Sequence, residues 1–342
     1  MSVGLYEYVG AVHVHTAFSD GEGAISEVIA AARAAGLDFL IITDHNDLRA
    51  REYEGWHGGT LVLAGEEVTR PGGNHMLALG ITELIPPDVS PQEGIDAAKA
   101  QGGLAFVAHP FYQGSPIIDD PPLPWRDWSV ERFDGIEVWN LTADLHQLLG
   151  ERGLERPPGE VLGYAAPNIA ALRKWDELLA RGRVVGLGGL DAHAERVARW
   201  GDEVILPYEK AFRALRVHLL LRERLQGVLD ADRSLIYRSL AAGNFFVGFD
   251  YLCPAAGTAV VALTDEGAIP PGEGLSPGGE REVELRVSLP YAGHILLIKG
   301  GMVVSEAEGE EVSFRIAGAG PYRVEVYREG RHWIIANPIY LR

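Results

Sequence analysis

The chain has 342 residues, and its 30 Lys and Arg against 48 Asp and Glu give a formal net charge of −18. A surface this acidic repels the phosphates of nucleic acids and anionic lipids, which argues against broad electrostatic docking on either. An apolar share of 47% excludes a largely disordered chain, and the single Cys253 excludes an internal disulfide and a cysteine-rich metal cluster.

The start of the chain carries no sign of export. Residues 1–7 have neither the basic start nor the long apolar run of a secretory signal. Apolar stretches stay below the roughly 18 to 20 residues that span a bilayer, and one cysteine fits a reducing compartment. We therefore expect a cytoplasmic protein without membrane contact.

Up to about residue 250, short apolar strands alternate with loops and Ala-rich helical stretches. A helix after residue 24 is expected to end at Gly36, where a left-handed cap belongs. Another begins at Ser90-Pro91-Gln92-Glu93, which combines an N-cap Ser, an early Pro and a capping-box Glu. Strands are predicted at residues 9–14, 37–43, 61–63, 104–108, 135–139 and 184–187. The alternation predicts parallel βα units, either closed into a barrel or wound as an open sheet.

Two stretches interrupt this alternation of strands and helices. Residues 114–128 hold four prolines and two tryptophans directly after His109-Pro110, and they predict either a lid over a site or a rigid surface loop. Residues 209–240 are rich in Arg and Leu, and they predict a pair of packing helices.

After Pro254 the pattern changes to strict alternation of polar and apolar residues, at 282–289 and 322–327. Turns are expected at Pro270-Pro271-Gly272, Gly278-Gly279 and Gly300-Gly301. We therefore expect two domains, a βα domain at 1–254 and a small β-sandwich-like domain at 255–342.

Metal-binding residue types gather at the ends of the predicted strands. His13 and His15 lie two apart at the end of a strand, so both imidazoles point to one face and can hold one metal ion. The other candidates follow later strands, where the loops of a barrel gather reactive groups: Asp20, His45, Glu67, His109, Asp191 and His193. His75 reaches the same rim if residues 71–74 turn the chain back. The remaining five histidines match no motif, and we expect them to be ordinary: His57, His146, His218, His294 and His332.

In order and spacing, these motifs resemble the polymerase and histidinol phosphatase (PHP) superfamily over about residues 8–250. The matching segments are His13-x-His15, Ser19-Asp20-Gly21, Thr43-Asp44-His45, Gly65-x-Glu67, His75, Ala108-His109-Pro110 and Asp191-x-His193. Segments 134–140, 322–325 and 337–340 are similar to the CehA/McbA branch, which is named for hydrolases of an aryl carbamate. The resemblance implies a distorted (β/α)7 barrel with a trinuclear metal centre, followed by a small all-β domain.

The resemblance also implies three ligand sets. His13, His15, Glu67 and Asp191 would hold one ion; Glu67, His75 and His109 would hold a second; Asp20, His45 and His193 would hold a third. Many PHP proteins have His where this chain has Asp20. Glu67, rather than its neighbour Glu66, fits the Gly-x-Glu motif, and Asp44 is expected to support the ligands by hydrogen bonding.

Nitrogen and oxygen ligands suit two or three divalent Zn, Mn or Fe ions. Such ions can lower the pKa of a bridging water, whose hydroxide would be the nucleophile. We therefore expect a phosphoesterase acting on a small anionic substrate, with no catalytic group beyond that hydroxide. Arg70 and Arg196 are candidates to bind the phosphate. The alternatives are hydrolysis of a carboxylic or carbamate ester at the same centre, and a non-catalytic metal-binding module. The oligomeric state is left open.

Overall fold

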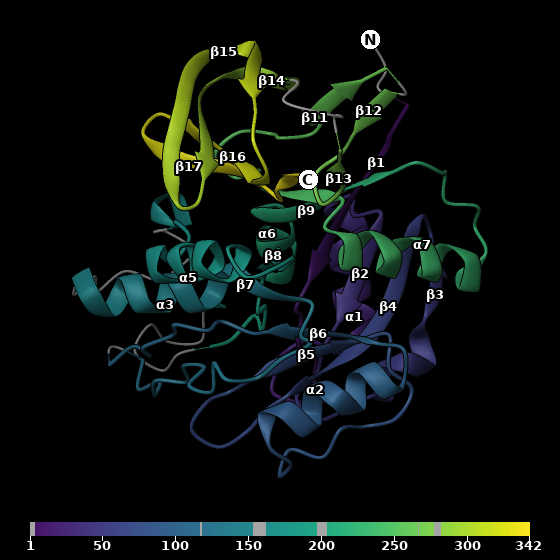
Figure 1. The fold of residues 1–342 in the computed structure, drawn as a ribbon. Helices are drawn as coiled ribbons and strands as arrows, with labels where there is room; N and C mark the ends of the chain where they lie inside the picture. Colours follow the sequence, from purple (N-terminus) through teal and green to yellow (C-terminus); the bar gives the residue numbers. More distant parts are fainter. Residues whose placement is uncertain (1–3, 117, 153–161, 197–203, 266, 277–281) are drawn as a thin grey trace. The chain divides into compact units, whose positions relative to one another are not determined.

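A computed structural model describes residues 4–116, 118–152, 162–196, 204–265, 267–276 and 282–342 (Figure 1). The chain divides into two compact units, each assembled from separate segments. The first unit comprises Gly10–Leu172 and Leu187–Leu215, and the second comprises Met1–Val9, Arg173–Gly186 and Arg216–Arg342. The expected domain boundary at residue 254 lies within the second unit and stays a prediction.

Strands and helices alternate as far as residue 215. In chain order the elements are β1 (Tyr6–Val12), α1 (Ile25–Ala34), β2 (Phe39–Ile42), the 3-10 helix η1 (Arg49–Tyr53), β3 (Gly55–His57), β4 (Thr60–Val68), β5 (Met76–Leu79), α2 (Pro91–Ala100), β6 (Leu104–Val107), β7 (Gly135–Asn140), α3 (Leu141–Arg152), the 3-10 helix η2 (Leu162–Tyr164), α5 (Ile169–Leu179), β8 (Val185–Gly189) and α6 (Tyr208–Phe212). The six strands predicted from the sequence are all present, with ends shifted by a few residues.

The sheet pairing of the first unit is mostly parallel. Strand β1 pairs with β2, β2 with β4, and β6 with β7, all in parallel. All four residues of β2 are buried, as expected for a parallel strand covered on both faces. Strand β5 is the exception, because it runs antiparallel to both β4 and β6. The chain therefore turns back after β4, which confirms the expected return of His75 to the rim. That seven βα units form a barrel stays a prediction.

The helix signals in the sequence are confirmed. At the start of α2, the Ser90 hydroxyl accepts a hydrogen bond from the Glu93 amide, and the Glu93 carboxylate accepts one from the Ser90 amide. Gly36 has a φ of 72° just beyond α1, the left-handed geometry that favours glycine there. Helix α2 packs alongside β5 and β6 (Figure 1).

The expectation of a helix pair over residues 209–240 is wrong in its centre. Strand β9 (Leu215–Leu221) lies between the short α6 and α7 (Leu229–Ala242). Leucine favours helices in isolation, but six of the seven residues of β9 are buried. Burial of both faces overrides this propensity, and a short buried apolar run does not distinguish strand from helix by its periodicity.

From residue 245 onward, the described residues form strands and no helix. They are β10 (Phe245–Phe249), β11 (Ala259–Thr264), β12 (Gly267–Ile269), β13 (Gly274–Leu275), β14 (Val283–Lys299), β15 (Met302–Ile316), β16 (Gly320–Arg328), β17 (Arg331–Ala336) and β18 (Ile339–Leu341). Both predicted alternating runs are strands, within β14 and β16. Gly300 and Gly301, both with positive φ, form the expected turn between β14 and β15. The turn expected at 278–279 lies outside the described residues.

The second unit has its own apolar core. Strand β14 pairs with β11, β15 and β16, and β10 pairs with β17, all antiparallel. Trp333, Phe246 and Leu285 are fully buried in this core. A sandwich arrangement of these strands stays a prediction. No helix in the described part of the chain has the length and apolar character needed to cross a membrane.

Candidate metal centre

The candidate ligands lie in the first unit, at or just beyond the ends of its strands. His13 directly follows β1, Glu67 lies near the end of β4, and His109 comes two residues after β6. Parallel bridges join His45 to Glu67 and Val14 to Ala192, so the segments that carry the ligands are hydrogen-bonded to one another. The backbone therefore brings together residues that are far apart in the sequence.

Three of these residues have a strained backbone. The φ angles of His13, His109 and Asp191 are 67°, 25° and 53°, in the left-handed region that costs non-glycine residues about 1–3 kcal/mol each. Such strain persists only where the surrounding structure holds it, and it is concentrated at functional sites. Its occurrence at three candidate ligands points to a site whose geometry matters for function.

Glu67 is the centre of the cluster. It is fully buried, and its two carboxylate oxygens are each surrounded by imidazole nitrogens. Oε1 lies 3.1 Å from His75 Nδ1 and 3.0 Å from His109 Nε2; Oε2 lies 3.2 Å from His13 Nε2, 3.3 Å from His15 Nε2 and 3.0 Å from His45 Nδ1.

The nine candidate ligands fall into three groups whose donor atoms lie within 4.8 Å of one another. The groups are His13, His15, Glu67 and Asp191; Glu67, His75 and His109; and His15, Asp20, His45 and His193. The first two coincide with sets implied by the PHP resemblance. The third contains the expected set together with His15, which therefore belongs to two of the groups.

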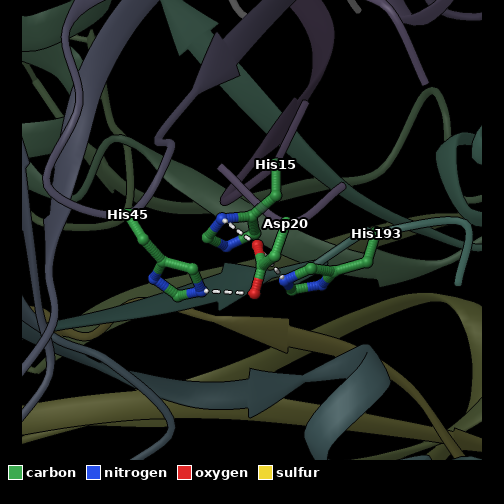
Figure 2. Close-up of side chains that lie close together, drawn as sticks. All are labelled: His15, Asp20, His45 and His193. Carbon is green, nitrogen blue, oxygen red and sulfur yellow. Dashed lines mark ion pairs between the residues drawn. The ribbon is translucent and has the colours of Figure 1, made fainter. Parts of the chain in front are cut away.

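Figure 2 shows the third group, with the Asp20 carboxylate among three imidazole rings. Asp20 Oδ1 lies 3.2 Å from His193 Nε2, and Oδ2 lies 3.3 Å from His45 Nε2 (Figure 2). The third distance, from Oδ1 to His15 Nδ1, is longer at 3.8 Å. The Asp20 side chain is 57% exposed, so this group is the one most open to solvent.

The pKa values of Glu67 and His45 are shifted in opposite directions. Burial raises the pKa of Glu67, but the charges of His45 and His13 outweigh it and hold that pKa well below its ordinary value. Burial lowers the pKa of His45, yet the carboxylates of Glu67 and Asp20 raise it to about 10. Several imidazoles thus carry the positive charge that balances the buried carboxylates.

His15 shows that these residues fit a bound metal. Burial, and then the charges of His193 and His45, lowers the pKa of His15 to about 3, so its ring is neutral. Neither ring nitrogen has a hydrogen-bond partner among the described residues. Nevertheless, Nε2 lies 3.3 Å from Glu67 Oε2 and 3.2 Å from Asp191 Oδ1. A nitrogen lone pair facing two carboxylates is the arrangement that a cation between them would satisfy.

A further carboxylate, Glu137 on β7, supports the cluster. Its Oε1 lies 2.7 Å from His13 Nδ1, and its Oε2 accepts hydrogen bonds from the His109 amide at 2.7 Å and from Asn140 Nδ2 at 2.8 Å. A carboxylate on the far nitrogen of a ligating histidine fixes its tautomer and orientation. Sequence reasoning missed this role, although an acidic residue inside a fully buried strand was a signal for it.

The side chains of Asp44 and Glu66 accept hydrogen bonds from residues that are not candidate ligands. Asp44 accepts hydrogen bonds from the amide and hydroxyl of Thr16 and from the Ser19 hydroxyl, and so holds the loop that carries Asp20. Glu66 accepts a hydrogen bond from the Ile85 amide at 2.9 Å. Burial raises the pKa of Glu66 to about 7.

The two arginines proposed as phosphate ligands differ in their surroundings. Arg70 is buried, and its guanidinium donates to the carbonyls of Val89 and Asn74. These bonds favour a role in fixing its own loop rather than in binding substrate. Arg196 is exposed and forms an isolated bridge with Val204. Its role in substrate binding stays a prediction.

A cavity of about 550 Å³ adjoins the cluster. It is lined by Asp20, His45, Thr69, His75, His109, Tyr112, Asp120, Leu123, Thr142, Ala143, His146, Asp191, His193 and Glu195. The proline-rich stretch contributes Asp120 and Leu123, so it forms part of the cavity wall. The stretch is tied down by the Trp125 amide, which donates to Pro110, and by the Arg126 amide, which donates to Asn74.

The fold and the cluster define a mixed α/β protein with grouped candidate metal ligands at its strand ends. Residues 11–109 match the PHP domain. The protein MJ1587 of Methanocaldococcus jannaschii, described as uncharacterized, is 31% identical over 144 residues, which cover 38% of this chain and 80% of that protein. The chain therefore carries a PHP domain and belongs to one family with the archaeal protein.

Two solved structures are also similar. A two-domain protein from Bacteroides vulgatus, described as containing a predicted PHP-like metal-dependent phosphoesterase, is 16% identical with a TM-score of 0.45; the match covers 98% of this chain and 96% of that one. A proposed metal-dependent phosphoesterase from Bifidobacterium adolescentis is 19% identical with a TM-score of 0.36; here 54% and 87% are covered.

Proposed function

We propose that this protein is a metal-dependent phosphoesterase that hydrolyses a small phosphate ester. One observation carries the proposal: nine nitrogen- and oxygen-donating side chains converge in three groups, beside a cavity large enough for a small substrate. The donor set contains no sulfur, which suits two or three Zn, Mn or Fe ions. When bound, such ions lower the pKa of a water molecule toward neutrality and neutralise charge on phosphoryl oxygens.

Hydrogen bonds from other residues of the chain orient three of the imidazoles. Glu137 accepts a hydrogen bond from His13 Nδ1, so Nε2, which faces Glu67, is the nitrogen available to a metal ion. The carbonyl of Arg70 does the same for His75 Nε2, and the carbonyl of Asp191 does so for His193 Nδ1. These hydrogen bonds fix the orientation of each ring, and the positively charged imidazoles would release a proton when an ion binds.

The charge of the filled centre favours an anionic substrate. Three divalent ions would outweigh the three carboxylates of Asp20, Glu67 and Asp191, and the rim would then be locally positive although the whole chain is strongly acidic. A small anion is drawn into such a pocket, whereas a nucleic acid meets the acidic surface outside it. We therefore keep a small phosphate ester as the leading substrate class, and we expect neither nucleic-acid docking through the surface charge nor membrane contact.

A second candidate function is hydrolysis of a carboxylic or carbamate ester at the same centre. The observation that favours it is the composition of the cavity wall, which includes no Lys or Arg among its described lining residues. A neutral ester meets no unpaired cation there, and metal ions polarise a carbonyl as well as a phosphoryl group. The similarity to the CehA/McbA branch agrees with this candidate.

The two candidates are separated by paired assays on protein loaded with Zn, Mn or Fe. An aryl phosphate, a nucleotide, a cyclic phosphodiester and an aryl carbamate would be compared. We expect turnover of at least one phosphate ester and inhibition by free phosphate. Turnover of the carbamate alone would favour the second candidate. Metal binding without any turnover would leave a non-catalytic PHP module.

A cytoplasmic location stays a prediction.

A further inference from the structure

The cavity has two chemically different sides. One is formed by candidate metal ligands, including His75, His109 and Asp191. The remaining polar lining includes two carboxylates outside the cluster, Asp120 and Glu195, and its described residues include no Lys or Arg. A substrate whose phosphate occupies the metal side therefore has its leaving group near Asp120, Glu195 and the His146 imidazole that faces both carboxylates.

His146 on α3 holds the two carboxylates apart and in place. Its Nδ1 lies 3.4 Å from Asp120 Oδ2, and its Nε2 lies 2.7 Å from Glu195 Oε1. The imidazole itself is buried, with both nitrogens turned to carboxylates. Burial lowers the pKa of His146, but Asp120 and Glu195 raise it to about 9. Two carboxylates thus face one imidazole on this side of the cavity.

In the part of the chain that the structure describes, each carboxylate has one oxygen without a hydrogen-bond partner. The Tyr112 hydroxyl donates to Asp120 Oδ2, the oxygen that also faces His146. Asp120 Oδ1 and Glu195 Oε2 have no hydrogen-bond partner within the described ranges, and the two side chains are 28% and 35% exposed. An ionised carboxylate accepts hydrogen bonds and donates none. These oxygens thus suit a donor group and oppose an anion.

We propose that Asp120 and Glu195 are specificity-determining residues, which select phosphate esters whose leaving group carries a hydrogen-bond donor and no negative charge. The inference rests on the proposed phosphoesterase function. It applies equally to an ammonium and to a hydroxyl group, because both donate hydrogen bonds to a carboxylate. A leaving group with a carboxylate or a second phosphate meets like charge at short range and is disfavoured.

The test uses three phosphate monoesters of similar size on the metal-loaded full chain. O-phosphoethanolamine carries an ammonium, 2-hydroxyethyl phosphate a hydroxyl, and phosphoglycolate a carboxylate. We expect kcat/KM for each of the first two to exceed that for phosphoglycolate by about tenfold. A larger preference for the ammonium ester would identify charge, and equal preference would identify hydrogen bonding, as the selecting feature.

Variants assign the preference to the two residues. The double variant Asp120→Asn, Glu195→Gln keeps the shape of both side chains and removes their charge, and we expect the preference to fall to about threefold or less. Each single substitution should lose part of it, which keeps the test valid if the double variant does not fold. Glu131→Gln, at an exposed position, should retain the full preference. A wild-type preference for phosphoglycolate, or an unaltered preference in the folded variants, would overturn the proposal.

Calorimetric binding of the same three esters separates this inference from the proposed function. If the protein turns over no phosphate ester, the phosphoesterase proposal fails, yet the ratio of dissociation constants still reports selection. Equal dissociation constants for all three esters would contradict the inference even where turnover is observed.

Discussion

Glu67 is the residue on which the metal cluster depends, because its two oxygens contact five imidazoles. We predict that Glu67→Gln loses at least one bound divalent ion per chain, since an amide offers only one neutral acceptor where two groups share a carboxylate. Metal content by mass spectrometry after dialysis measures the loss.

The neighbouring Glu66 provides the matched control. Glu66→Gln keeps an acceptor for the Ile85 amide and should retain the wild-type metal content. Equal metal loss in both variants would show that local unfolding, rather than a lost ligand, is responsible. Full metal content in a folded Glu67→Gln protein would contradict the shared-ligand assignment.

Glu137 contacts His13 at Nδ1, and we propose that it positions this candidate ligand without binding metal itself. We predict that Glu137→Gln weakens metal binding by about 10- to 100-fold, the usual cost of losing a partner of a ligating histidine. The side-chain amide of the introduced glutamine would place an N–H donor opposite the backbone N–H of His109 or the side-chain N–H of Asn140. These groups are also donors, so the hydrogen bonds would be lost. Competition with a chromophoric chelator measures the change, and an unchanged dissociation constant would remove Glu137 from the site.

For individual residues, the sequence predicts which side chains are candidate ligands but few of the contacts between them. His-x-His and Gly-x-Glu are local patterns, so the candidate ligands could be named in advance. The pairing of His13 with Glu137 joins residues 124 positions apart, and no local pattern encodes it. His146 was expected to be ordinary for the same reason, since its partners Asp120 and Glu195 come from other loops.

Among the elements, α2 depends on its capping box. We predict that Ser90→Ala lowers the free energy of unfolding by about 1 kcal/mol, because the Glu93 amide loses its acceptor. In a chain of this size the melting temperature should fall by about 2 °C. Metal content should not change, and a simultaneous loss of metal would mean that α2 and the cluster are coupled.

The strands show where sequence reasoning succeeds and where it fails. Apolar runs flanked by glycine and polar residues predicted β2, β6 and β7 to within a few residues. The run that forms β9 has leucine-rich composition and no flanking turn that separates it from a helix. Its strand conformation depends on burial, which is a property of the assembled unit and not of the segment.

At the scale of the molecule, the two compact units are built from segments distant in sequence. Composition marks a change near residue 254, but it does not reveal that β10 pairs with β17 or that residues 173–186 belong with the C-terminal strands. Such pairings follow from tertiary contacts.

The stability of the second unit should depend on pH through His218. Burial lowers the pKa of this fully buried imidazole, but Asp250 and Glu7, at 3.3 and 2.7 Å, raise it above 6.5. Arg216 also pairs with Asp250. Because the folded-state pKa is raised, the contribution is complete below pH 6.5 and is lost as pH rises through the folded-state value.

Denaturant unfolding of the wild type and of His218→Gln at pH 6, 7.5 and 9 tests this prediction. The difference in free energy of unfolding between the two proteins should shrink as pH rises. A difference that stays constant across this range would show that His218 is neutral in the folded protein.

We propose that this chain is a metal-dependent phosphoesterase because its nitrogen and oxygen donors are grouped as a metal site requires. Hydrolysis of a phosphate ester by metal-free protein, titrated with Zn, Mn or Fe, tests this proposal directly. We predict negligible turnover without metal, and a rise that saturates at two to three ions per chain. Turnover that persists in the metal-free protein, or that is absent at every metal loading, would contradict it.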